Sequence, residues 1–319
     1  MVSTLFGRSQ VSALYLAALL GLILFLLGFH YQGAAEHSLY FGPWEMSLPR
    51  WLDLFLGSIL AFLFPLILQR WFQGEAKFYK PHMYLPLIGV IGMAIGLASN
   101  FGTASMILLY IFTALIYATI LPVLNQEPIH REANIALLFG LSIHIFPGMW
   151  IYMILFIISL MIYGQISFKT LFVLFLGTLA PFYFSWATSF LLDSQQTYGQ
   201  WVRSTLFTLD HISIPGIEGV LLPLFTFGFW IILSFTDFFA TLSRAKINKR
   251  QGFILFGLSV VIGVMGMGVA GLQPLLITVS LPLILIFTNT IQYVRRSWWI
   301  DLLVIASLAV SVSLNFLTF

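Results

Sequence analysis

Cysteine is absent from the 319 residues of this chain. Disulfide bonds, thiolate nucleophiles and cysteine-ligated metals are therefore excluded. Charged residues are also scarce, at 8% of the chain, whereas soluble domains carry about 25%. A water-solvated surface cannot be built from so few charges. The formal net charge of +3 does not indicate a nucleic-acid partner, because basic loops on the inner side of a membrane protein produce the same excess.

Apolar residues make up 60% of the chain and occur in long, unbroken runs. These runs lack the alternation of a transmembrane β-strand, so a β-barrel is excluded. Helices remain, because every backbone polar group in hydrocarbon has to be satisfied within its own segment. The sequence therefore predicts an all-α fold, a polytopic transmembrane helical bundle that forms a single integral membrane domain over residues 1–319. Its first partner is the lipid bilayer.

Eleven apolar segments approach or reach the length of about 20 residues that a membrane span needs. They cover residues 11–29, 54–72, 84–98, 104–123, 133–146, 149–163, 171–192, 220–240, 253–271, 274–291 and 298–319. The fifth and sixth are short and meet at Phe146-Pro147-Gly148. Residues 133–163 therefore form either two short spans or one long helix kinked at the proline.

The distribution of basic residues distinguishes these two arrangements. With eleven spans and a cytoplasmic N-terminus, 12 of the 14 basic residues lie inside, and only Arg50 and Arg203 lie outside. Merging residues 133–163 into one span instead leaves 6 inside and 8 outside. The positive-inside rule favours the first arrangement. We therefore expect a tight outer turn at Phe146-Pro147-Gly148 and an outer C-terminus.

Polar side chains concentrate in two longer loops on the predicted outer side, residues 30–51 and 193–219. The candidate catalytic residues are Glu36, Glu45 and His211. A carboxylate of the first loop and the histidine of the second would act together, one as base and one as the group that orients it. No HExxH spacing or Walker motif occurs in the chain, and we predict no metal site and no cofactor.

The second loop also contains the candidate substrate-binding residues, Arg203, Trp201 and Asp210. A guanidinium fork suits the oxygens of a lipid phosphate or pyrophosphate, although Arg203 could equally pair with Asp210. Residues 200–212 place four apolar side chains on one helical face, namely Trp201, Leu206, Leu209 and Ile212. This spacing is typical of a short amphipathic helix in the membrane interface, and the alternative is a structured loop packed on the rim of the bundle.

Three aspartates lie in or beside predicted spans. Asp237 is within the eighth span, where an ionisable group indicates either a function or a paired structural role. We interpret it as structural, paired with Arg244 or with Asn289. Asp53 and Asp301 begin their spans, and we interpret both as helix caps, since helix N-termini favour negative charge.

Five short sequence motifs are distributed along the chain. Phe6-Gly7-Arg8-Ser9 precedes the first span, and Arg131-Glu132-Ala133-Asn134 leads through an apolar run to Phe146-Pro147-Gly148. Three more follow, namely Pro181-Phe182-Tyr183-Phe184, Ile214-Pro215-Gly216 and the stretch from Lys246 to Arg250. In these motifs and in layout the chain resembles an uncharacterised family of multi-pass inner-membrane proteins typical of Bacteroidota. The resemblance implies a bacterial inner (cytoplasmic) membrane and supplies no catalytic residues.

The sequence does not decide whether the protein is an enzyme, and three hypotheses stay open. The first is a non-catalytic subunit or scaffold in cell-envelope biogenesis, bound to other membrane proteins and sensitive to change at close-packing residues such as Gly92 and Gly96. The second is an outer-face enzyme, similar to a glycosyltransferase, acting on a polyprenyl-linked or other lipid substrate. The third is a lipid or small-solute transporter or flippase. None of them involves nucleic acid.

Overall fold

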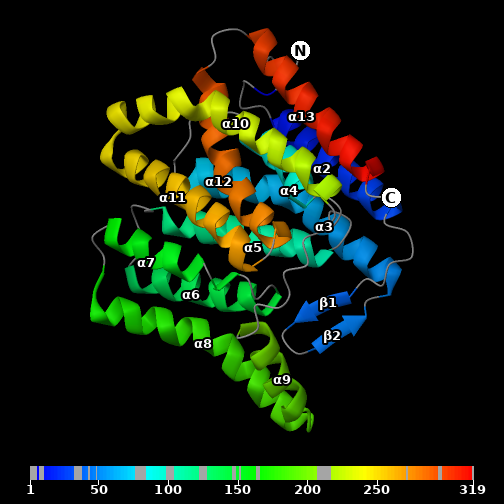
Figure 1. The fold of residues 1–319 in the computed structure, drawn as a ribbon, viewed down its shortest axis with the longest axis vertical. Coiled ribbons are helices and arrows are strands. Elements are labelled where there is room, and N and C mark those ends of the chain that lie inside the picture. The colour runs from blue at the N-terminus through cyan, green and yellow to red at the C-terminus, as the bar shows by residue number, and fades with distance from the viewer. Residues whose placement is uncertain are drawn as a thin grey trace.

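The structure is a computed structural model that describes residues 6, 11–31, 38–41, 44–47, 49–75, 84–97, 104–121, 128–145, 149–150, 152–162, 166–206, 217–270, 272–293 and 297–317. It is built almost entirely of helices (Figure 1). Four of them are long and apolar enough to cross a membrane, Val11–His30, Arg50–Phe72, Phe168–Leu191 and Leu221–Arg244. Shorter apolar helices accompany them. The chain is therefore a membrane protein.

The described elements follow one another in a simple order. They are α2 (Val11–Tyr31), β1 (Ser38–Phe41), β2 (Trp44–Ser47), α3 (Arg50–Leu68) continued by the π-helical turn η1 (Gln69–Glu75), α4 (Tyr84–Leu97), α5 (Ala104–Ile120), α6 (Pro128–Ile145), α7 (Tyr152–Ile162), α8 (Phe168–Leu191), α9 (Gln195–Leu206), α10 (Ile217–Arg244), α11 (Ile247–Ala270), α12 (Leu272–Tyr293) and α13 (Ser297–Leu317). Each of the eleven apolar segments found in the sequence overlaps one of these helices. The remaining helix is α9.

Helix α9 corresponds to the amphipathic segment predicted over residues 200–212. It begins earlier than predicted, at Gln195, and its described part ends at Leu206. The reason lies in the preceding turn. Asp193 adopts a left-handed conformation with φ of 52°, and the amide of Ser194 donates to the carbonyl of Ser189 at 2.8 Å. The chain therefore reverses directly after α8, and a new helix starts at once.

Residues 128–162 form two helices rather than one kinked helix. Phe139 of α6 and Phe156 of α7 place their ring centroids 5.9 Å apart. In one continuous helix these two positions would be separated by about 25 Å. The chain therefore folds back between α6 and α7, as the charge distribution predicted, although residues 146–148 themselves lie outside the described residues.

The prediction of an all-α fold is confirmed apart from one hairpin. Strands β1 and β2 pair antiparallel, with Ser38 opposite Ser47 and Phe41 opposite Trp44. The sequence analysis treats this stretch as a loop. Each strand has four residues and no β-branched side chain. The sequence signal for the hairpin is the dipeptide Gly42-Pro43, which is typical of a turn and lies between aromatic residues.

Helices α4 and α12 form the centre of the molecule. All 14 residues of α4 are buried, and α4 packs against α12 as well as α2, α3 and α13. The α5 residue Tyr110 shares a buried hydrogen bond with Ser280 of α12. Figure 1 shows α4 behind α12, with α5 to α8 on the lower side. Gly92 of α4 lies against Ile284 of α12, since an added Cβ would be 2.4 Å from Cγ1 of that isoleucine.

Helix α8 has the burial pattern of a helix that faces lipid. Its buried residues are small or polar for the most part and recur every three or four positions: Thr170, Leu174, Thr178, Pro181, Ser185 and Ser189. Its exposed residues are large and apolar, among them Phe168, Phe172, Phe175, Tyr183, Phe184 and Phe190. A soluble protein shows the reverse. In hydrocarbon, small residues allow helices to approach and large apolar ones contact the acyl chains.

Candidate functional site

The structure describes only part of the predicted site. Trp201 lies in α9 and is half-buried. Arg203 is also in α9, and Glu45 is in β2 opposite Tyr40, but the side chains of both lie outside the described residues. Glu36, Asp210 and His211 lie outside the described residues altogether.

Trp201 belongs to a cluster of rings that joins three helices. Its ring centroid lies 5.3 Å from that of His144 in α6, 6.1 Å from that of Phe182 in α8 and 5.8 Å from that of Tyr198. His144 and Phe182 are closer still, at 4.4 Å. We call these four residues the α6–α8–α9 ring cluster. It fixes the amphipathic helix α9 against the end of α6 and the second half of α8.

Two hydrogen bonds orient the ring cluster. The hydroxyl of Tyr198 donates to the carbonyl oxygen of Phe182 at 3.0 Å, and burial raises the pKa of that hydroxyl, so it stays a donor. His144 Nδ1 lies 2.9 Å from the carbonyl oxygen of Gly140. A carbonyl only accepts, so Nδ1 carries the proton. Sequence reasoning did not link His144 to Trp201.

Helices α6 and α8 approach unusually closely below this cluster. A Cβ added to Gly140 would lie 2.5 Å from the carbonyl oxygen of Thr178 and 2.9 Å from Cγ of Pro181. In the opposite direction, a Cβ added to Gly177 would lie 2.6 Å from Cβ of Ala136. Small residues on both helices therefore let the two backbones touch.

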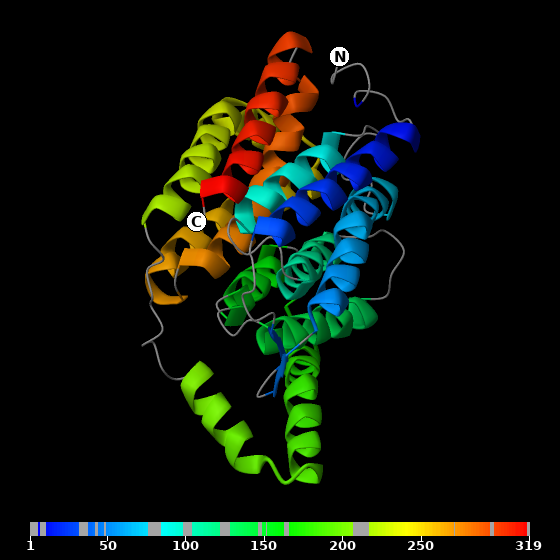
Figure 2. The same cartoon turned by 90° about the vertical axis from the view of Figure 1, so that its right-hand side faces the viewer.

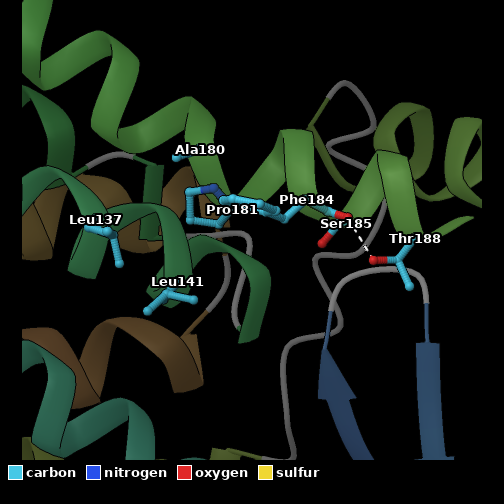
Figure 3. A pocket seen from close by; sticks show the side chains of 7 residues that line it. All are labelled: Leu137, Leu141, Ala180, Pro181, Phe184, Ser185 and Thr188. Atoms are coloured by element: carbon cyan, nitrogen blue, oxygen red, sulfur yellow. Dashed lines mark hydrogen bonds between the residues drawn. The ribbon is translucent and has the colours of Figure 1, made fainter.

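A groove of about 210 Å³ opens beside this contact. It is lined by Leu137, Leu141, Ala180, Pro181, Phe184, Ser185 and Thr188, and we call it the α6–α8 groove. Figure 3 shows the two leucines of α6 facing the α8 side chains, with the hydroxyls of Ser185 and Thr188 at one end. Thr188 Oγ1 donates to the carbonyl oxygen of Phe184 at 2.8 Å.

The α6–α8 groove suits a hydrocarbon chain. Its walls are apolar except at the hydroxyl end, and it opens between Leu137 and Phe184, which are both exposed. Its volume is below the range of about 300–1,000 Å³ that whole drug-sized ligands occupy. It therefore fits one chain of a lipid rather than a complete lipid molecule. Among the described residues, no three His, Asp or Glu side chains are grouped so that they could hold a metal.

Asp237 does not have the partners that the sequence suggested. It is half-buried in α10, and within the described part of the chain it forms no ion pair or hydrogen bond. Asn289 is engaged elsewhere, because it accepts from Lys249 Nζ at 2.9 Å and donates to Thr241 Oγ1 at 3.1 Å. The long side chain of Lys249, at the start of α11, thus reaches α12. Arg244 is exposed and forms no ion pair with Asp237.

Asp53 caps a helix, but not its own. It is buried in the first turn of α3, and its Oδ1 accepts from the amide of Ala104, the first residue of α5, at 3.0 Å. A carboxylate at a helix N-terminus satisfies an orphan amide and interacts favourably with the helix dipole. Asp301 is half-buried in the second turn of α13, and the first turn of that helix has no acidic residue, so the interpretation of Asp301 as its cap is wrong.

Comparison with known proteins gives one match. A family model described as a family of unknown function (DUF6427) matches residues 49–318. No curated protein matches the chain, and no solved structure does. The match confirms the resemblance to a family without known function, and it covers every helix from α3 to α13.

Proposed function

This chain belongs to the family of unknown function DUF6427, and we propose that it is a multi-pass protein of the bacterial inner membrane. In this proposal it has eleven spans, a cytoplasmic N-terminus and an outer C-terminus. It acts as a non-catalytic subunit or scaffold in cell-envelope biogenesis and binds other membrane proteins of an envelope complex.

The observation that carries this proposal is the outward face of α8. Helix α8 makes its main contacts with α6 and α9, and its second half projects with α9 beyond the other helices (Figure 2). Its exposed rings form a continuous series, with Tyr183–Trp186 and Trp186–Phe190 centroids both 6.1 Å apart. We call these three residues the α8 ridge. In a membrane such a face contacts either lipid or another membrane protein, and we assign the ridge to a protein partner because aromatic residues dominate interface energies.

Purification of the full chain in mild detergent tests this proposal. We expect a stoichiometric protein partner with the wild type and at least tenfold less of it with the double variant Tyr183→Ala/Trp186→Ala, because truncation removes the ridge rings. The matched control is Tyr15→Ala/Leu19→Ala on α2, where the two side chains are exposed to a similar extent as Tyr183 and Trp186. Mass spectrometry of the co-purified proteins measures both. A partner that stays with the ridge variant, or no partner at all, would contradict the proposal.

The α6–α8 groove supports a second candidate function, an outer-face enzyme acting on a polyprenyl-linked or other lipid. The chain would lie in the groove, and the catalytic candidates Glu36, Glu45 and His211 would act on the head group, with Arg203 on its phosphate. The same purification distinguishes this candidate. A co-purified polyprenyl phosphate without a protein partner would favour the enzyme over the scaffold.

The absence of cysteine allows a clean test of the topology. Gln196→Cys lies on the exposed part of α9, and Lys246→Cys lies in the exposed turn between α10 and α11. We expect a membrane-impermeant maleimide to label the α9 cysteine in intact spheroplasts and the other only after lysis. Equal labelling of both in intact spheroplasts, or the opposite order, would overturn the assigned orientation.

A further inference from the structure

A second pocket lies where α2 ends and α3 begins. Its volume is about 660 Å³, and it is lined by Leu26, Phe29, His30, Arg50, Trp51 and Leu54. Two of the four candidate spans, Val11–His30 and Arg50–Phe72, have their ends in this pocket. In a membrane, the ends of spans lie at the level of the lipid head groups. The pocket therefore combines apolar walls with a polar mouth at head-group depth.

Arg50 provides the charge in this pocket. Its guanidinium carbon lies 5.2 Å from the ring centroid of Phe29, a cation–π contact that holds the side chain at the mouth. Among the described residues it has no ion pair. The nearest acidic residue along α3 is Asp53, whose carboxylate is buried and accepts from the amide of Ala104. Within the described part of the chain, the donor fork of Arg50 is therefore open to a ligand.

The other lining residues indicate which ligand this is. Trp51 is 68% exposed, and exposed tryptophans at span ends sit among lipid head groups. The imidazole of His30 also lines the pocket. Leu26 and Leu54 continue into the exposed apolar faces of α2 and α3, which carry Ile23 and Phe55. A free anion would use only the mouth, whereas a lipid would use the mouth and the walls.

We propose that this pocket binds an anionic phospholipid, with the lipid phosphate on Arg50 and the start of one acyl chain against Leu26 and Leu54. Guanidinium binds phosphate through two parallel hydrogen bonds, which an ammonium cannot reproduce. The site is separate from the α6–α8 groove and from the α8 ridge. The lipid-binding proposal is therefore tested independently of the proposed scaffold function.

Native mass spectrometry of the full chain in detergent, with phosphatidylglycerol added, tests the proposal. We expect one tightly held phosphatidylglycerol on the wild type and at least tenfold less on Arg50→Gln. Arg50→Lys should hold an intermediate amount, because it keeps the charge and loses the fork. Arg250→Gln, at an exposed arginine in the first turn of α11, is the matched control and should bind as the wild type does.

Two further arms make the result decisive. Leu26→Trp fills the apolar part of the pocket without changing the charge, so it should also lose the lipid. Phosphatidylcholine and sodium phosphate replace phosphatidylglycerol in separate experiments, and both should bind at least tenfold more weakly. Wild-type binding by Arg50→Gln or by Leu26→Trp, or equal binding of free phosphate, would overturn the proposal.

Discussion

Gly140→Ala is expected to destabilise the detergent-solubilised protein by about 3 kcal/mol, at the upper end of the usual cost of overpacking. The added methyl group would lie 2.5 Å from the carbonyl oxygen of Thr178 and 2.9 Å from the ring of Pro181. Neither a backbone carbonyl nor a proline ring inside a helix can rotate away. The two helices would have to separate, and the α6–α8 groove would change shape. Thermal unfolding followed by size-exclusion chromatography measures the loss.

Gly228→Ala on α10 is the matched control. A Cβ at this position meets nothing within 4 Å, so the variant should be as stable as the wild type or slightly more stable, since alanine favours the helix by about 1 kcal/mol over glycine. Gly92→Ala should fall between the two, because the atoms within 3 Å of its Cβ belong to the side chain of Ile284, which can shift. If Gly140→Ala unfolds at the temperature of Gly228→Ala, α6 and α8 are not in close contact.

The helices could be predicted from the sequence because one physical requirement decides them. An apolar run in hydrocarbon has to satisfy its own backbone, and a helix is the way to do so. The break at Phe146-Pro147-Gly148 was predicted separately, from the distribution of basic residues, and the Phe139–Phe156 contact agrees with two helices there. The position of α9 was less well predicted. Its start depends on the left-handed Asp193, and an aspartate in that conformation cannot be told from any other in the sequence.

The α6–α8 groove could not be predicted, because it depends on which helices are neighbours. Helix α7 lies between α6 and α8 in sequence, and most apolar faces of a membrane protein look alike. A signal does exist in retrospect. Ala133, Ala136 and Gly140 lie on one face of α6, and α8 carries Thr178 and Ser185 at matching intervals. Small residues at such spacing indicate a helix contact, although they do not name the partner.

The buried polar residues show the same limit. Sequence position made Asp53 a cap of its own helix, α3, but the helix that it caps is α5, which lies about 50 residues further on. Asn289 was a proposed partner of Asp237, but Lys249 and Thr241 occupy it. Residue type and depth therefore indicate that a polar group needs a partner, and only the tertiary arrangement decides which one it has.

Trp230→Ala is expected to have the largest effect of any single substitution, a destabilisation of about 4 kcal/mol. Trp230 of α10 is almost completely buried. It stacks on Phe287 of α12 with centroids 4.5 Å apart and planes at 8°, and its Nε1 donates to Ser307 Oγ of α13 at 3.2 Å. One side chain thus joins three helices. Trp230→Phe keeps the stacked ring and loses the hydrogen bond, so it should cost about 1 kcal/mol.

Phe225→Ala on the same helix is the matched control, because it truncates an exposed ring instead of a buried one. Phe225 is 76% exposed, so in a bilayer its ring contacts lipid, and lipid chains replace it when it is truncated. Association of helices in hydrocarbon has no hydrophobic driving force and depends on packing and hydrogen bonds. The exposed ring should therefore contribute almost nothing, whereas the buried one contributes its full packing. Unfolding temperatures in detergent measure both. Equal losses for Trp230→Ala and Phe225→Ala would mean that the outer face of α10 packs against protein, and the lipid-facing assignment of that helix would be wrong.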